Sequence, residues 1–343
     1  MNRPWRPEIP KRIAGAALLA LLSPILAACG GGGSDDELVV YSGRSEELVA
    51  PLIERFEKSS GKTVEVRYGN SAELAATLLE EGDNTPADVF FSQDAGALGA
   101  LQKANLLAPL PRAVLNRVDP KWRSPQGRWV GTSGRARIVA YDKREVRANE
   151  LPPTIDGFTD PRWKGKLGWA PTNASFQAFV TAMRRLRGDA ATERWLKGVV
   201  ANDPERFEDN EPLRDAIAQG EVEVGFLNHY YVARAIAENG PGYPVGVHFT
   251  KGGDPGSLVN VAGVAILKGS QDDAGAKEFV EYLLSRPAQA YFARETKEYP
   301  LTAGVRPDPS LVPLASIQSP RLDLSDLDDV QGTERLIRRS GAL

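Results

Sequence analysis

The sequence predicts an α/β fold in which a mostly parallel sheet carries helices on both faces. Two observations support this class. Short β-rich runs alternate along the chain with segments of helical periodicity. The roughly 300 residues that follow the N-terminal region are enough to bury a large core without other support. Length alone indicates two domains or one large one.

The first elements form a β-α-β unit. Residues 38–41 are a β-rich run, residues 45–59 place apolar side chains at helical spacing, and residues 63–68 return to alternation. The same order then repeats, with a helix at 71–81, a buried strand at 88–92 and a helix at 96–104. This repetition is typical of a parallel sheet.

Later segments continue the alternation. Strands are predicted at 129–131, 137–141 and within 222–228 and 256–267, and helices at 176–187, 190–200, 274–284 and 287–295. Ligands of open α/β sheets bind outside the carboxyl ends of the strands. We therefore expect the loops that follow strands to converge on one cleft, namely residues 42–45, 92–94, 171–175 and 228–231.

The N-terminus predicts export. Four basic residues precede an apolar stretch from Ile13 to Leu26, which is too short to remain as a membrane-spanning helix. Residues 1–28 are therefore interpreted as a lipoprotein signal peptide, because Leu26 to Cys29 resembles a lipobox whose cysteine is lipidated after cleavage. The alternative is a plain secretory signal followed by an unmodified Cys29.

Residues 29–37 are predicted to be a flexible tether, because four glycines and a polar stretch cannot bury enough surface to fold. The globular part is thus expected to be extracytoplasmic and attached to the membrane only through the lipid. Removing residues 1–28, which contain four basic residues and one acidic residue, leaves 38 basic and 44 acidic residues. This acidic balance argues against a nucleic-acid partner.

Catalytic motifs are absent. The chain has two histidines, His229 and His248, and one cysteine, and it lacks a Gly-x-Ser-x-Gly elbow, a phosphate-binding Gly-Lys-Ser loop and a His-Glu-x-x-His run. Zinc is also excluded, since two histidines nineteen residues apart have no zinc-site spacing. We expect a protein that is not an enzyme. An exported hydrolase with a tyrosine or carboxylate nucleophile is the alternative from another class.

Tyr230 and Tyr231 are the most informative pair. They follow a short apolar run, so both phenols can reach one cleft. Phenolate oxygen is a hard donor that suits a hard cation such as Fe(III). The alternative is an aromatic pair that packs in the core or stacks on a ligand.

Seven segments in order extend this hypothesis over residues 38–305. They are LVVYSGRSEE at 38–47, LLEEGDNTPADVFFSQD at 78–94, WVGTSGRARIVAYD at 129–142, DPRWKGKLGWAPTNASF at 160–176, GEVEVGFLNHYY at 220–231, DPGSLVNVAGVAILK at 254–268 and EYPL at 298–301. Together they resemble the ferric-iron substrate-binding proteins of bacterial ABC importers. The resemblance implies the type II periplasmic-binding-protein fold, with two α/β lobes joined by hinge strands. The implied lobes are residues 38–133 with 254–306, and residues 134–253 with 307–343.

The resemblance also implies the site. Tyr230 and Tyr231 match the two tyrosines that bind Fe(III). A synergistic anion (carbonate, phosphate or citrate) is expected near Arg135 and at a helix start, where free N–H groups favour negative charge. The anion-binding positions are Asn173, Ala174, Ser175, Asn210, Asn228 and Arg135. For Arg135, an interlobe salt bridge or simple surface charge are alternatives.

The chain departs from its relatives where they place further ligands. Ser45 and Glu46 stand where some members have His, or His followed by Tyr, Gln93 where some have Glu, and Phe176 where some have a third Tyr. Anions and water must then supply most donor atoms. Gln93 and Glu46 are candidate additional ligands, and the alternative for Glu46 is a solvated helix-start acid. If its segment is extended, His229 faces away from Tyr230 and has a structural role.

The resulting hypothesis is a monomeric binding protein that captures Fe(III) with an anion, closes by hinge motion and delivers the iron to an ABC permease. The alternative keeps the fold and changes the ligand to a ferric chelate or a small organic anion such as a phosphonate.

Overall fold

The fold is organised around β4 (Val130–Asp142), a strand of thirteen residues that are all buried. Residues 130–136 pair antiparallel with β9 (Val259–Ile266), and residues 137–141 pair antiparallel with β7 (Val224–Asn228). The strand thus changes partner between Ala136 and Arg137. The sequence predicted two separate strands here, and that prediction is wrong. A register shift between Gly131 and Ser133, where the chain is glycine-rich, hides the continuity.

The computed structural model describes residues 37–343, which form one compact unit. The predicted signal peptide, Cys29 and all of the predicted tether except Glu37 lie outside the described residues. Glu37 does not belong to a tether, because it is the first residue of β1. No helix within residues 37–343 is long and apolar enough to span a membrane.

The first lobe, as we use the term, contains the parallel strands β1 (Glu37–Ser42), β2 (Thr63–Tyr68) and β3 (Val89–Ser92), followed in the sheet by antiparallel β9. β10 (Tyr299–Pro300) pairs with β4. The predicted β-α-β unit is confirmed. The helices of this lobe are α1 (Glu46–Ser60), α2 (Ser71–Glu81), α3 (Ala95–Lys103), α4 (Arg112–Leu115), α9 (Ala274–Leu283) and α10 (Arg286–Arg294).

The second lobe contains the strand order β4-β7-β5-β6, with β8 (Val245–His248) also paired to β4. β5 (Leu167–Trp169) and β6 (Glu205–Arg206) are short and parallel. The helices are α5 (Ala174–Arg187), α6 (Asp189–Val200), α7 (Asn210–Gln219) and α8 (His229–Asn239). A chain of edge-to-face rings, Trp169, Phe176, Phe179, Trp195 and Phe226, fills the core between β5, β7, α5 and α6.

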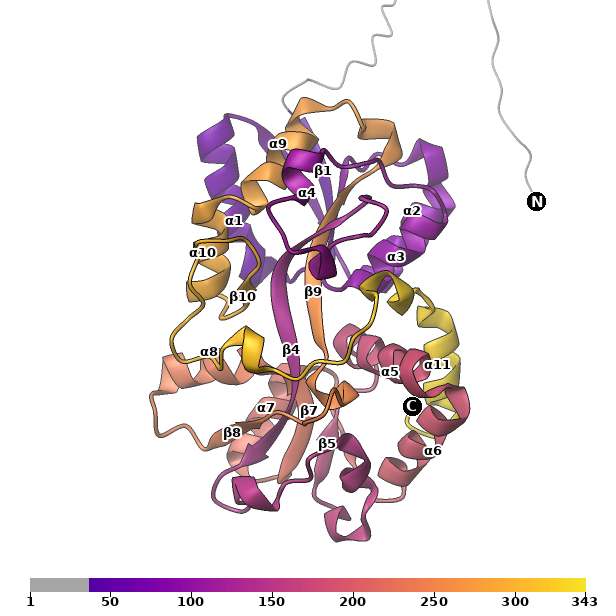
Figure 1. Cartoon of the computed structure of the whole chain (residues 1–343), viewed down its shortest axis with the longest axis vertical. Helices are drawn as coiled ribbons and strands as arrows, with labels where there is room; N and C mark the ends of the chain where they lie inside the picture. The colour runs from indigo at the N-terminus through magenta and orange to yellow at the C-terminus, as the bar shows by residue number, and fades with distance from the viewer. Residues whose placement is uncertain (1–36) are drawn as a thin grey trace, which may run out of the picture. The chain divides into compact units, whose positions relative to one another are not determined.

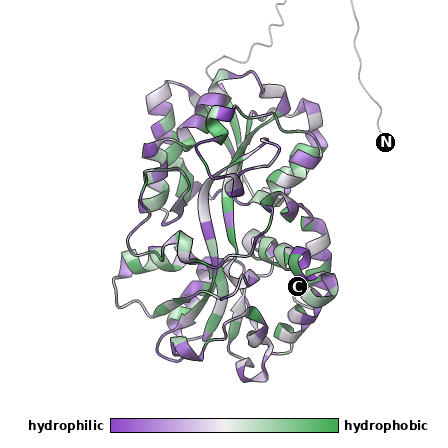
Figure 2. Cartoon of the chain, viewed as in Figure 1, coloured by the Kyte–Doolittle hydropathy of each residue, from purple (hydrophilic) through white to green (hydrophobic). Residues whose placement is uncertain are grey.

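β4 and β9 run side by side through the middle of the described chain, with the helices of the first lobe at one end and those of the second at the other (Figure 1). Coloured by hydropathy, the helices show apolar residues toward the strands and polar residues outside (Figure 2). This pattern is the amphipathic periodicity from which the α/β class was predicted. The predicted class is confirmed.

The C-terminal segment contacts both lobes. A 3-10 turn at Leu324–Asp328 packs on α3, and α11 (Val330–Arg339) packs on α5 and α6. Asp328 forms ion pairs with Lys103 of α3 at 2.5 Å and with Arg185 of α5 at 3.0 Å. Assigning residues 307–343 wholly to the second lobe therefore leaves out the packing of the 3-10 turn on α3 and the ion pair of Asp328 with Lys103. The lobe limits themselves stay a prediction.

Gly99→Ala tests the packing of this segment. A Cβ at Gly99 would lie 2.3 Å from the carbonyl oxygen of Ser325, so α3 and the 3-10 turn must separate. Overpacking of this kind costs about 1–3 kcal/mol. We expect a lower free energy of unfolding in urea, whereas Gly242→Ala, which meets open space, serves as the control. A Gly99→Ala protein as stable as the wild type would contradict the packing described.

Candidate functional site

The starts of α3 in the first lobe and α5 in the second lobe border one small space. In the first lobe, Asp94 caps α3 by accepting from the N–H groups of Gly96 and Ala97. In the second lobe, Asn173 caps α5 through Ser175 N–H. Asp94 and Ala174 line the same space, whose volume is only about 10 Å³. Two of the four loops predicted to converge, 92–94 and 171–175, therefore border one small space.

Tyr230 and Tyr231 lie in the first turn of α8, directly after β7. Their rings stack with centroids 4.2 Å apart and planes inclined by 29°. Tyr230 is fully buried and Tyr231 is 8% exposed. Tyr230 Oη is buried and has no hydrogen-bond partner in the part of the chain that the structure describes. Burial raises the pKa of Tyr230, and the positive charge of Arg135 opposes this rise. Burial also raises the pKa of Tyr231 well above its ordinary value.

His229 begins α8, so the segment is not extended here and the alternation considered for an extended chain does not apply. The helix starts immediately because Asn228 adopts the extended N-cap conformation. His229 Nδ1 accepts the N–H of Ala136 at 3.1 Å, and the ring stacks on Tyr299 at 4.7 Å. The neutral imidazole therefore carries its proton on Nε2. These contacts give His229 the structural role that was expected, through a different geometry.

A buried cluster of charge lies beside Tyr230. Glu298 Oε2 accepts from Arg44 Nη2 at 2.9 Å, from Ser133 Oγ at 3.0 Å and from Thr296 Oγ1 at 3.0 Å. Arg135 Nε stands 3.9 Å from the other carboxylate oxygen. Arg135 is 2% exposed, so it is not a surface charge. Among residues 37–343, its Nε and Nη1 atoms have no hydrogen-bond partner, and Glu298 Oε1 has none either.

The predicted anion loop forms a second network. Ser175 Oγ donates to Asn173 Oδ1, and it accepts from Asn210 Nδ2 at 3.3 Å and from Arg137 Nη1 at 3.2 Å. Asn210, the first residue of α7, is fully buried. Asn228 is opposite Arg137 in the β4–β7 register. Asn173, Ser175 and Asn210 thus belong to one hydrogen-bonded network with Arg137.

The two candidate additional ligands, Gln93 and Glu46, lie in different environments. Gln93 Oε1 accepts from Arg44 Nη1 at 2.8 Å, and because arginine can only donate, the oxygen of the amide is already engaged. Glu46 is exposed at the start of α1, as expected of a solvated helix-start acid. Phe176, where relatives have a tyrosine, is buried against Trp169 and Phe179.

The sequence reasoning missed Arg44, Glu298 and Arg137, which are all at most 3% exposed. Arg137 was detectable, since Arg135 and Arg137 stand two residues apart in a β-rich run and so lie on one face of the strand. The partnership of Arg44 with Glu298 joins residues 254 positions apart, and no local pattern predicts it.

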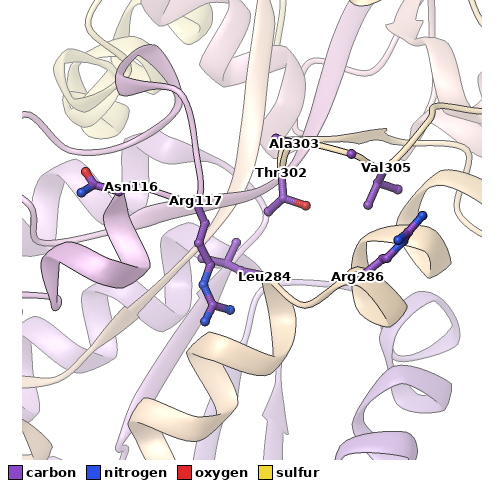
Figure 3. Close-up of a pocket in the computed structure, with 8 residues that line it drawn as sticks. Asn116, Arg117, Leu284, Arg286, Thr302, Ala303 and Val305 are labelled. Carbon is purple, nitrogen blue, oxygen red and sulfur yellow. The ribbon is translucent and has the colours of Figure 1, made fainter.

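Other features of the described residues do not compete with this site. No group of three or more His, Cys, Asp or Glu side chains within residues 37–343 is placed to hold a metal. A cavity of about 300 Å³, shown in Figure 3, lies at the end of α4 and the start of α10 beside residues 302–305. It contains none of the predicted site residues.

The pH dependence of stability tests the placement of His229. Burial lowers the pKa of His229 to about 4, from 6.5. Between these two pKa values the unfolded chain binds a proton that the folded protein does not bind. The stability that neutral His229 contributes is therefore fully present above pH 6.5 and is lost as the pH falls to 4. Its size is about 3 kcal/mol.

We expect urea unfolding of the iron-free protein to show a steeper loss of stability between pH 6.5 and 4 than His229→Gln, which does not titrate. His248→Gln is the control, because His248 is only half-buried and should leave most of the slope. Equal slopes for the wild type and His229→Gln would refute the placement.

Comparison with known proteins agrees with this geometry. Residues 84–324 match the family of bacterial extracellular solute-binding proteins. The chain is 32% identical over 329 residues to the major ferric iron-binding protein of Neisseria meningitidis serogroup B, covering 95% of this chain and 96% of the relative.

Two solved structures are also similar. They are iron-bound HitA from Pseudomonas aeruginosa (31% identity, TM-score 0.84) and Trichodesmium IdiA (FutA) in complex with iron and citrate ligands (31% identity, TM-score 0.76), each covering 89% of this chain and 99% of that chain.

These comparisons confirm the type II periplasmic-binding-protein fold and the predicted resemblance to ferric-binding proteins. The family consists of solute-binding transport proteins and not of enzymes, so the hydrolase alternative is wrong. The chain belongs to the bacterial extracellular solute-binding proteins, and within them it is similar to those that bind ferric iron.

Proposed function

We propose that this protein captures Fe(III) together with a synergistic anion outside the cytoplasm and delivers the iron to an ABC permease. The observation that carries the proposal is the stacked, buried pair Tyr230 and Tyr231 beside three buried guanidinium groups. Phenolates are hard donors for Fe(III). The ferric-binding names of the relatives support the same cargo.

Iron binding must expel two phenolic protons. Burial raises the pKa of both tyrosines, so neither ionises unaided near neutral pH. Binding of a trivalent cation offsets the free energy needed to hold both tyrosines as phenolates. Because protons compete for the same oxygens, affinity for iron should fall in acid.

Charge balance calls for an anion. Fe(III) with two phenolates carries one net positive charge. Arg44, Arg135 and Arg137 add three more, and the buried carboxylates nearby are Glu298 and Asp94. Burial raises the pKa of Asp94, which weakens its contribution. Uncompensated positive charge is costly in a buried site, so an anion of charge two or more would stabilise the loaded state.

Arg135 is the residue best prepared to hold the anion. Its Nε and Nη1 atoms are buried and free of hydrogen bonds, and a guanidinium fork matches carboxylate, carbonate or phosphate. In the α5 loop, by contrast, Ser175 N–H already donates to Asn173 Oδ1. We therefore assign the first contact with the anion to Arg135. The α5 start supports it through the helix dipole.

An ion pair connects the two lobes next to the tyrosine pair. Arg234, one turn after Tyr230 in α8, pairs with Glu47 of α1 and, at 3.4 Å, with Glu211 of α7. An ion pair between α1 and α8 favours the closed state, and the bound cargo would add to it. Lipidation of Cys29 would keep the protein near its permease and raise its effective concentration there.

Tyr230→Phe with Tyr231→Phe tests the cargo. Wild-type protein loaded with Fe(III) should show a visible phenolate-to-iron charge-transfer band. The double variant should lose that band and bind iron well over about 100-fold more weakly, a larger loss than removal of an outer partner causes. Tyr299→Phe, which removes a buried phenol outside the pair, is the matched control. Persistence of the band in the double variant would sink the assignment.

Arg135→Met tests the anion. In wild-type protein, adding carbonate or citrate to anion-free buffer should raise the affinity for Fe(III) by about 10-fold or more, a typical contribution of groups that support a metal site. In Arg135→Met the same additions should have little effect, because the free donor atoms are gone. Isothermal titration with iron at fixed anion concentration measures both. Full anion enhancement in the variant would contradict the assignment.

The alternative cargo is a ferric chelate, and the excess of buried guanidinium groups is the observation that favours it. Native mass spectrometry of protein exposed to ferric citrate distinguishes the two cases. Mass added for iron and one small inorganic anion supports the main proposal. Retention of iron with intact citrate supports the chelate.

A further inference from the structure

The C-terminal segment connects the two lobes, in addition to β4 and β9, and it is buried in both of them. Leu324 and Leu327 of the 3-10 turn are 4% and 0% exposed and belong to the hydrophobic core that includes α3. Leu336 and Ile337 of α11 belong to a separate core, which includes Phe179 of α5. Figure 1 shows the turn beside α3 and α11 beside α5. Each end of this connection is therefore anchored in a different lobe.

Backbone contacts hold the 3-10 turn on the first lobe. A Cβ at Gly96 would lie 2.4 Å from the carbonyl oxygen of Leu327, so the backbones of α3 and the turn approach with no side chain between them. Lys103 of α3 adds its ion pair with Asp328. Close packing of this kind resists sliding. We therefore expect the turn to move together with α3.

Side-chain hydrogen bonds hold the start of α11 on the second lobe. Arg184 of α5 donates to Asp329 Oδ2 and to Thr333 Oγ1, each at 2.9 Å, and the hydroxyl groups of Thr333 and Thr181 lie 2.7 Å apart. Between the two anchored parts, the backbone at Asp329 is neither helical nor extended, with φ −84° and ψ 60°. A motion of one lobe against the other must therefore be absorbed at residues 328–330.

Arg185 reaches across this boundary. It belongs to α5 of the second lobe, yet its Nε donates to the carbonyl oxygen of Asp326 at 2.7 Å and its Nη2 donates to Asp328 Oδ1 at 3.0 Å. Both acceptors are in the 3-10 turn that packs on the first lobe. Separation of the lobes would break both hydrogen bonds, whereas the ion pair of Asp328 with Lys103 would stay intact within the first lobe.

We infer that residues 328–330 are a hinge of their own, and that Arg185 favours the closed arrangement of the lobes by binding the 3-10 turn. The inference rests on the proposed function only because it takes the lobes to open and close around a cargo. No cargo is needed for these contacts. The side chain of Arg185 is 40% exposed, so water screens the contacts and their contribution is modest. Bound cargo then remains the main determinant of closure.

The distance between labels on the two lobes tests the role of Arg185 in iron-free protein. Nitroxide labels on Thr63→Cys and Lys164→Cys, both exposed and one in each lobe, report that distance by pulsed EPR, with Cys29→Ser leaving no other thiol. Arg185→Met should raise the ratio of open to closed protein by about 2–10-fold, because an ion pair and a charged hydrogen bond are lost. Lys103→Met is the matched control. It removes the other cation from the same carboxylate and should leave the ratio unchanged.

Iron release gives a second measurement. Transfer of iron from loaded protein to a chelator should be faster in Arg185→Met by a similar factor, since cargo leaves from the open state. The absorption maximum of the charge-transfer band should stay at the wild-type position, because the hydrogen bonds of Arg185 are to the 3-10 turn. A shifted maximum would mean that the substitution changes the site itself and would contradict the inference.

The remaining outcomes separate this inference from the proposed function. An unchanged distance distribution in Arg185→Met would refute the interlobe contact. Equal opening in Lys103→Met would show that the turn does not stay on α3, and the hinge at residues 328–330 would then be wrong. Should Arg185→Met not fold, Arg185→Gln removes the same charge and allows the same comparison. If wild-type protein shows no charge-transfer band with iron, the proposed function fails, while the distances measured without iron still decide this inference.

Discussion

The site depends on one constraint, the uninterrupted passage of β4 from the sheet of the first lobe into that of the second. Pairing with β9 ends at Ala136 and pairing with β7 begins at Arg137. Arg135 and Arg137 lie on one face of the strand on either side of this junction. Because all of β4 is buried, both charges sit where their fields are poorly screened. The tyrosine pair at the start of α8 therefore meets a fixed positive field.

Glu298 lowers the electrostatic cost of these buried positive charges in the iron-free protein. One carboxylate oxygen serves Arg44, Ser133 and Thr296, and the other stands near Arg135. An unpaired cluster of buried guanidinium groups would strongly destabilise the fold. A single carboxylate offsets part of that charge and leaves the remainder to attract phenolates and an anion. The same residues thus stabilise the iron-free protein and also favour the binding of an anion.

Much of the fold was predictable because it follows from local periodicity. The β-α-β unit and the helices α1, α2, α3, α5, α6, α9 and α10 were predicted at nearly their observed limits, whereas α4, α7, α8 and α11 were not predicted. Two predictions failed where neighbours in space decided the outcome. β4 is one strand because partners from two lobes hold it, and Glu37 is drawn into the sheet by pairing with Thr63. Arg44 and Glu298 were missed because their contact spans most of the chain.

The sequence by itself determined the class of fold, the likeness to ferric-binding proteins and the positions of Tyr230 and Tyr231, since these depend on residue type and spacing along the chain. Tertiary structure alone decided the electrostatics. It showed that Arg135 is buried rather than at the surface, that the Gln93 side-chain oxygen accepts a hydrogen bond from Arg44, and that Arg137 has no carboxylate partner among the described residues. Burial and the distance between charges set the energy of an ionised group, and both depend on segments that only folding brings together.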